Sequence, residues 1–124
     1  MAFTTTTIAS PLVTKFAKDT VSNLTVETVT GSAADLYFVE IVNPNSTTAA
    51  YVKIFNAASG SAITGQHKIQ LYCPANSTCY YYIPTSVPVA NGMQFYVSTT
   101  PGIQSGNNTL VAPGTAVTVK IGHS

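Results

Sequence analysis

Cys73 and Cys79 are the only cysteines in the chain, and their spacing is the first candidate for chemistry. Each lies in a short run of alternating apolar residues, which places both thiols on the same face of their strands. If the two runs pair as a hairpin, the cysteines lie opposite each other, at Cβ separations of about 4.5–5.5 Å that are slightly long for a disulfide. The pattern leaves two readings open: buried thiols in a reducing cytoplasm, or a disulfide formed after release from the cell. A zinc site is not expected, because the C-x5-C spacing exceeds that of a zinc knuckle.

Few residues could carry acid–base or nucleophilic catalysis. The carboxylates are Asp19, Glu27, Asp35 and Glu40, and the imidazoles are His67 and His123. The sequence has no nucleophile elbow, zinc-protease motif or glycine-rich phosphate loop. Serine and threonine are abundant, but a hydroxyl becomes a nucleophile only beside a base. We therefore expect no enzymatic activity, no cofactor and no metal.

Three consecutive tyrosines, Tyr80–Tyr82, are the strongest candidates for a binding surface. A strand sends Tyr81 to one face and Tyr80 and Tyr82 to the other, where Tyr72 joins them if the cysteine hairpin forms. Tyrosine supplies a large contact area at a low entropy cost. The outer tyrosines Tyr72, Tyr80 and Tyr82 are therefore either a binding interface or a face covered by the rest of the fold.

The elements that must position these residues are strands, because apolar residues recur with period two between clusters of Gly, Pro, Asn and Ser. Expected strands cover residues 24–30, 36–42, 49–55, 68–73, 79–83, 93–98 and 115–122, with an eighth over 4–8. The pattern predicts an all-β fold, a single β-sandwich of jelly-roll or immunoglobulin-like type with seven to eight antiparallel strands. Runs 36–42 and 49–55 are expected to form one hairpin, and runs 68–73 and 79–83 another. The expected core contains Ile41, Val52, Ile54, Leu71, Tyr81, Phe95, Val117 and Val119.

The chain divides into an N-terminal arm, residues 1–18, and a sandwich domain, residues 19–124. The start of the arm is rich in threonine and carries two large apolar residues, Phe3 and Ile8, before Pro11. Such a segment could add a strand to the edge of a neighbouring sheet, which makes Phe3 and Ile8 candidate interface residues. It could equally be an extended, frayed terminus.

The composition indicates a binding or assembly subunit. Only 7% of residues are charged while 45% are hydrophobic, so the expected surface is rich in hydroxyls and amides and can be buried at little electrostatic cost. The chain has no arginine, its lysines are scattered and its net charge is +1, so we expect no nucleic-acid partner. No stretch has the 18 or so apolar residues of a spanning helix, and no basic leader precedes an apolar segment, so we expect no membrane partner.

The segments YVKIFNA (51–57), IPTSVPVANGMQF (83–95) and VTVKIG (117–122) resemble small virion proteins of tailed phages, especially phages of cyanobacteria. The resemblance spans residues 35–124 and rests on strand and turn patterns. It implies a compact β-sandwich on the outside of a virion, commonly a capsid decoration or cement protein assembled in the host cytoplasm.

The resemblance and the low charge predict a non-enzymatic structural protein that stabilises a phage head by bridging capsid subunits. Its expected partners are the major capsid protein and further copies of itself, most simply as a homotrimer at local threefold points. The alternative is a tail-fibre or tail-tip module that binds a host surface glycan or protein, because such modules reuse the same folds.

Overall fold

The computed structural model describes residues 13, 15–22, 24, 26–58, 67–101 and 111–124, and these residues form an all-β domain. Its strands are β1 Lys15–Val21, β2 Glu27–Thr30, β3 Ala34–Asn43, β4 Ala50–Asn56, β5 Ile69–Cys73, β6 Ser77–Val89, β7 Met93–Ser98 and β8 Val117–His123. Within the described residues there is no helix of the length and apolar character needed to span a membrane. The expected all-β fold is therefore confirmed.

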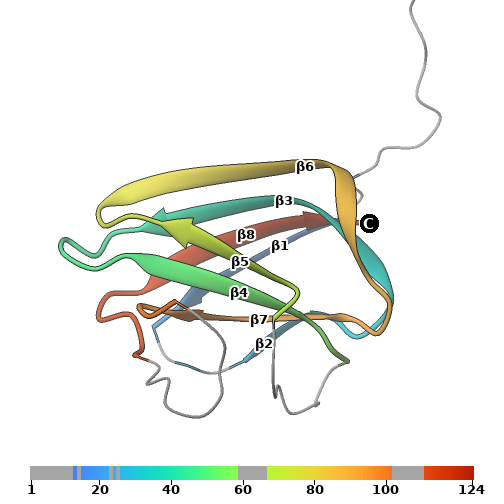
Figure 1. The fold of residues 1–124 in the computed structure, drawn as a ribbon, viewed down its shortest axis with the longest axis horizontal. Coiled ribbons are helices and arrows are strands. Elements are labelled where there is room, and N and C mark those ends of the chain that lie inside the picture. Colours follow the sequence, from blue (N-terminus) through green and yellow to red (C-terminus); the bar gives the residue numbers. More distant parts are fainter. Residues whose placement is uncertain (1–12, 14, 23, 25, 59–66, 102–110) are drawn as a thin grey trace, which may run out of the picture.

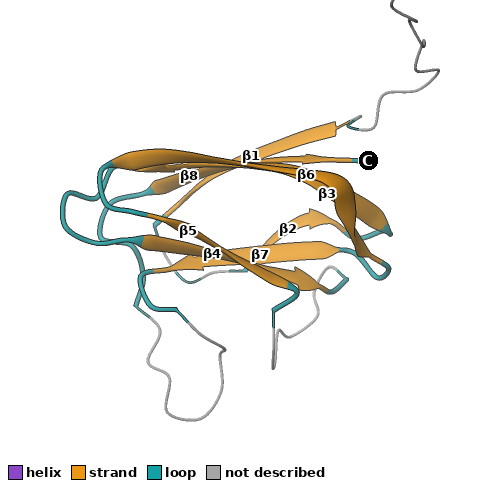
Figure 2. Ribbon diagram, turned by 45° about the horizontal axis from the view of Figure 1, so that its top comes forward, coloured by secondary structure: helices purple, strands orange, loops and turns teal. Residues whose placement is uncertain are grey.

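The strands form two antiparallel four-stranded sheets, ordered β1-β8-β3-β6 and β2-β7-β4-β5 (Figure 1). Figure 2 shows these sheets as two stacked layers, which confirms the expected β-sandwich. Except between β4 and β5, each strand is followed by one in the opposite sheet. This strand order is that of a jelly roll, the first of the two expected arrangements. An immunoglobulin-like sandwich would keep its first two strands side by side, whereas β1 and β2 lie in different sheets.

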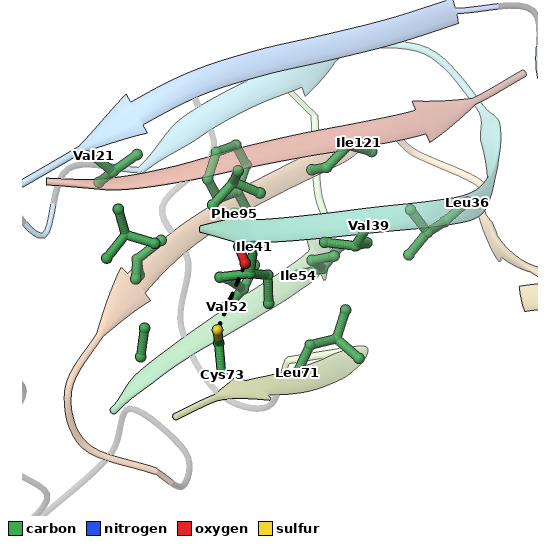
Figure 3. Close-up of a cluster of buried hydrophobic side chains, with 14 of the residues drawn as sticks. Val21, Leu36, Val39, Ile41, Val52, Ile54, Leu71, Cys73, Phe95 and Ile121 are labelled. Atoms are coloured by element: carbon green, nitrogen blue, oxygen red, sulfur yellow. Dashed lines mark hydrogen bonds between the residues drawn. The ribbon is translucent and has the colours of Figure 1, made fainter. Parts of the chain in front are cut away.

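The core lies between the sheets and is formed by alternate residues of every long strand (Figure 3). Of the eight expected core residues, seven are at most 7% exposed, namely Ile41, Val52, Ile54, Leu71, Phe95, Val117 and Val119. The eighth, Tyr81, is half-buried and packs against this cluster. Its hydroxyl donates a hydrogen bond to the carbonyl oxygen of Tyr72, which links β6 to β5 across the two sheets.

Both expected hairpins are wrong, because each pairs strands that the structure places in opposite sheets. β3 pairs with β6 and β8, while β4 pairs with β5 and β7. Period-two alternation marks which side of a strand is buried, but it is the same for strands paired side by side and for strands stacked face to face. A short loop can cross between sheets about 10 Å apart as easily as it can close a hairpin.

Two strands depart from the expected boundaries. β1 is an additional strand, and the domain boundary expected at residue 18 falls inside it. Its inward residues Ala17, Asp19 and Val21 include only one large apolar side chain, so the sequence shows no alternating pattern there. β6 continues through Pro84 and Pro88, which were expected to end it, because it is an edge strand and half of its amides need no ladder partner.

Two buried asparagines hold the loops at one end of the sandwich. The Asn43 amide nitrogen donates to the carbonyl oxygens of Thr48 and Pro74, at 2.9 and 3.1 Å, and so links both crossover loops. The Asn45 side chain donates to the Thr115 carbonyl at 3.0 Å and accepts from its amide at 2.8 Å. Asn43 and Asn45 thereby hold the two crossover loops and the segment that leads into β8.

Candidate binding surface

The outer face of the sheet β1-β8-β3-β6 carries three rows of side chains, and each row crosses all four strands in register. Successive rows lie two residues apart along every strand, so all three point away from the core. The rows are Phe16, Gly122, Phe38 and Tyr82; then Lys18, Lys120, Glu40 and Tyr80; then Thr20, Thr118, Val42 and Thr78. We call these twelve positions the aromatic face.

The first row is a chain of contacting aromatic rings. The Phe16 and Phe38 centroids are 6.2 Å apart with ring planes at 77°, and those of Phe38 and Tyr82 are 5.1 Å apart at 48°. Gly122 makes room for this chain, because a Cβ there would lie 3.0 Å from Phe16 Cε1 and 3.1 Å from Phe38 Cβ. Phe16 is 61% exposed and Tyr82 is 73% exposed. Large apolar rings this exposed on a flat sheet are unusual unless something covers them.

The second row adds charge beside the rings. The Lys120 ammonium lies 4.9 Å from the Phe16 ring centroid, in cation–π contact. Lys120 on β8 pairs with Lys18 on β1 and with Glu40 on β3. These three residues, with Val42 and Thr118, line a depression of about 410 Å³. Two lysines and one glutamate give the face a net charge of +1, so an acidic side chain on a partner would complement it.

The structure places the expected interface tyrosines on opposite sides of the molecule. Tyr80 (56% exposed) and Tyr82 lie on the aromatic face, whereas Tyr72 (47% exposed) lies on the outer side of β5 in the other sheet. The expectation that all three share one face is wrong, because it assumed the β5–β6 hairpin. The expected arm residues Phe3 and Ile8 lie outside the described residues.

Sequence reasoning missed Phe16 and Phe38. Phe38 belongs to the apolar run LYFVEIV, where residues on both faces are apolar and the outward ones cannot be identified by type. Phe16 lies in β1, which was not expected as a strand. The one available signal was Gly122 inside the last strand, since glycine within a strand often marks a close approach by another group.

The two cysteines lie in opposite sheets at the β5/β6 edge of the sandwich, Cys73 at the end of β5 and Cys79 near the start of β6. Both are free thiols in the structure. The buried Cys73 thiol donates to the carbonyl oxygens of Ile41 at 3.6 Å and Ser77 at 3.4 Å (Figure 3 shows the former). Burial, together with hydrogen bonding to Cys79, raises the pKa of Cys73 to about 12. A Cys73–Cys79 disulfide stays a prediction, and it would join the two sheets.

Two carboxylates meet at the opposite, β1/β2 edge of the sandwich. Asp19 and Glu27 line a cavity of about 130 Å³ between the sheets, together with Phe95 and Ile121. Burial, and then the negative charge and hydrogen bond of Asp19, raise the pKa of Glu27. Glu27 therefore takes up a proton more readily than an isolated glutamate would.

The aromatic face brings exposed aromatic rings and charged side chains together on one sheet. Aromatic rings beside charged side chains are characteristic of protein interfaces. No group of three or more His, Cys, Asp or Glu residues that could hold a metal ion occurs in the described part of the chain. Comparisons with protein-family models, with curated proteins and with solved structures find no match.

Proposed function

We propose that the chain is a structural protein of a tailed-phage virion, a capsid decoration protein that binds the major capsid protein through the aromatic face. The observation that carries the proposal is the exposed row Phe16-Phe38-Tyr82 on a flat, weakly charged sheet. Jelly rolls are common among viral capsid proteins, which is consistent with this role but does not establish it.

The orientation of the rings favours a protein partner over a sugar. Sugar rings stack on aromatic faces that lie flat in the surface and share one plane. Here neighbouring ring planes are inclined by 77° and 48°, so the row has edges as well as faces and forms no common platform. Interlocking rings of this kind fit apolar side chains of a protein surface.

The size of the aromatic face sets its role in the interface. Four strands about 4.8 Å apart and three rows about 6.8 Å apart cover roughly 400 Å² with their side chains. A stable complex buries about 800 Å² on each partner. The aromatic face therefore supplies the centre of the contact, and further area must come from elsewhere. We propose that neighbouring copies in a homotrimer, together with the part of the arm that precedes β1, supply it.

A cement function follows from mass action. A protein that binds only the assembled lattice shifts the equilibrium toward that lattice. Low charge assists, because a surface of Tyr, Thr and few ions can be buried without stranding an unpaired charge.

The proposal is tested by co-sedimentation of the purified chain with phage heads prepared without it. Phe16→Ser and Tyr82→Ser should each weaken head binding by about 30-fold, the loss typical of a central interface residue. Both side chains are mostly exposed, so the variants should fold. Tyr72→Ser is the matched control, because it removes a half-exposed tyrosine from the other sheet and should bind as the parent does. Parent-like binding by both variants, or an equal loss in the control, would contradict the proposal.

A further inference from the structure

On the outer side of the sheet β2-β7-β4-β5, five side chains of β4 and β7 are buried, whereas the rings of the aromatic face are largely exposed. Lys53 is 0% exposed, Tyr96 1%, Gln94 2%, Ser98 0% and Phe55 4%. The register pairs Lys53 with Tyr96 and Phe55 with Gln94 across β4 and β7, so these side chains form one cluster. We call the five residues the lysine face.

Several polar groups of this cluster lack partners, although Gln94 Nε2 and Ser98 Oγ each donate a hydrogen bond. The Lys53 ammonium is buried without a hydrogen bond and lies 5.4 Å from the centroid of the Tyr96 ring. The Tyr96 hydroxyl and His67 Nδ1 are buried and unpartnered as well, as are Gln94 Oε1 and Thr100 Oγ1. His67 belongs to the same cluster, since its ring meets Phe55 edge-on at 6.2 Å, and burial together with the charge of nearby Lys53 lowers the pKa of its imidazole. Leaving a cation buried and unpaired costs several kcal/mol by general estimates, so a partner for Lys53 is strongly favoured.

The chain has no carboxylate side chain available for this lysine. All four Asp and Glu residues lie between positions 19 and 40, and residues 41–124 contain none. β4 and β7, which carry the five residues, and His67 all fall in this acid-free part. The four carboxylates lie on β1, β2 and β3, with Asp19 and Glu27 at the β1/β2 edge. The amide of the last residue, Ser124, bonds to the Asp35 carbonyl oxygen on β3, which places the chain end on the other sheet. None of the carboxylates in these 124 residues therefore pairs with Lys53, and a bound ligand can supply the counter-ion.

We propose that the lysine face holds a binding site for a carboxylate ligand, with the Lys53 ammonium as counter-ion and the Tyr96 hydroxyl and His67 Nδ1–H as hydrogen-bond donors. One carboxylate has two oxygens and several lone pairs, so it can accept from all three groups at once. The site is separate from the aromatic face and does not depend on the proposed capsid function.

The surroundings favour a carboxylate on a compact organic body. The Phe55 and Tyr96 rings stack at 5.4 Å with planes 23° apart and form an apolar wall beside the ammonium. Burial lowers the pKa of Lys53, and a bound anion would oppose that shift by stabilising the charged ammonium. His67, which is half-buried, keeps the most exposure of the cluster and marks the side facing solvent. A free organic acid and an acidic sugar both offer this chemistry.

Urea unfolding of the full chain in sodium acetate, compared with sodium chloride at equal ionic strength and neutral pH, tests the site. Acetate should raise the unfolding midpoint of the parent, because a ligand that binds only the folded state stabilises it. Lys53→Met fills the same volume without charge and should fold, but its midpoint should not respond to acetate. Lys68→Met removes an exposed neighbouring lysine and should respond as the parent does.

A second variant and a second pair of ligands complete the test. Tyr96→Phe keeps the ring and loses one donor, so it should weaken the apparent affinity for acetate by about tenfold. Glucuronate is compared with glucose: a stronger response to glucuronate than to acetate identifies an acidic sugar as the source, and an equal response identifies a small free acid. The proposal is overturned if the parent responds to neither carboxylate, or if Lys53→Met responds as the parent does. In either case Lys53 would not be the counter-ion of a carboxylate ligand.

Discussion

The substitution Gly122→Ala should disrupt the aromatic face while changing the stability of the fold only a little. The added Cβ would lie 3.0 Å from Phe16 Cε1, 3.1 Å from Phe38 Cβ and 3.2 Å from Val13 Cγ1, each too close for an ordinary contact. Phe38 Cβ is attached to the β3 backbone and can move little, whereas the exposed Phe16 ring can swing away. The expected result is a displaced Phe16 ring and a broken aromatic row.

The change in stability follows from three terms. Loss of the Phe16–Phe38 pair costs about 0.5–1.5 kcal/mol, and loss of the Lys120 contact with the ring about 0.5–1 kcal/mol. Replacing a glycine within a strand by alanine returns about 0.5–1 kcal/mol. The free energy of unfolding should therefore fall by no more than about 2 kcal/mol, while binding to phage heads falls at least about tenfold.

Urea unfolding measures the free energy of unfolding, and co-sedimentation with phage heads measures head binding. Gly114→Ala is the matched control, since its added Cβ would have only an ordinary 3.8 Å contact with Asn45 Oδ1. Unchanged head binding by Gly122→Ala would refute the role of the row. A loss of stability above about 3 kcal/mol would show that Phe16 cannot yield and that the row is part of the rigid fold.

Further predictions concern the core, the thiols and the arm. Ile54→Ala, at a fully buried site between the sheets, should lower the free energy of unfolding by about 2–5 kcal/mol in urea, and a loss under about 0.5 kcal/mol would contradict the core assignment. Oxidised glutathione should convert Cys73 and Cys79 into a disulfide by thiol–disulfide exchange. Mass spectrometry of the intact chain should then show the loss of two hydrogens, and the Cys79→Ser variant should not show this loss. The pKa of Cys73 is raised to about 12, so its thiolate fraction should rise about tenfold per pH unit between neutral pH and about pH 9, and the rate of disulfide formation should rise with it. A rate independent of pH would exclude attack by the Cys73 thiolate as the slow step. Deleting residues 2–11 should leave urea unfolding unchanged while abolishing the trimer in sedimentation equilibrium, and a parent chain that is monomeric at high micromolar concentration would rule out the homotrimer.

The sequence allowed the class of fold and the core to be predicted, but not the pairing of the strands. Val52, Ile54, Val117 and Val119 alternate with outward residues, so their burial follows directly from period two. Which strands pair depends on contacts between residues far apart in sequence, such as Phe16 with Gly122, and alternation carries no information about these. The β1 strand shows the limit most clearly, because its buried side has one large apolar residue.

The candidate surfaces could be predicted only in part. Tyr80 and Tyr82 were found from residue type and parity, and both are exposed. Their neighbours on the aromatic face come from three other strands, so the row became visible only with the register. The buried state of Lys53 ran against its type, since a lysine that alternates with Val52 and Ile54 is expected in solvent.

The number of copies of the chain in purified particles tests the proposed role most directly. Quantitative mass spectrometry of particles from a phage whose genome encodes the chain would measure it against the major capsid protein. A capsid decoration protein on a lattice of repeated symmetry points should be present in on the order of hundreds of copies per particle. A count of about a dozen or fewer would contradict that role and indicate a tail appendage.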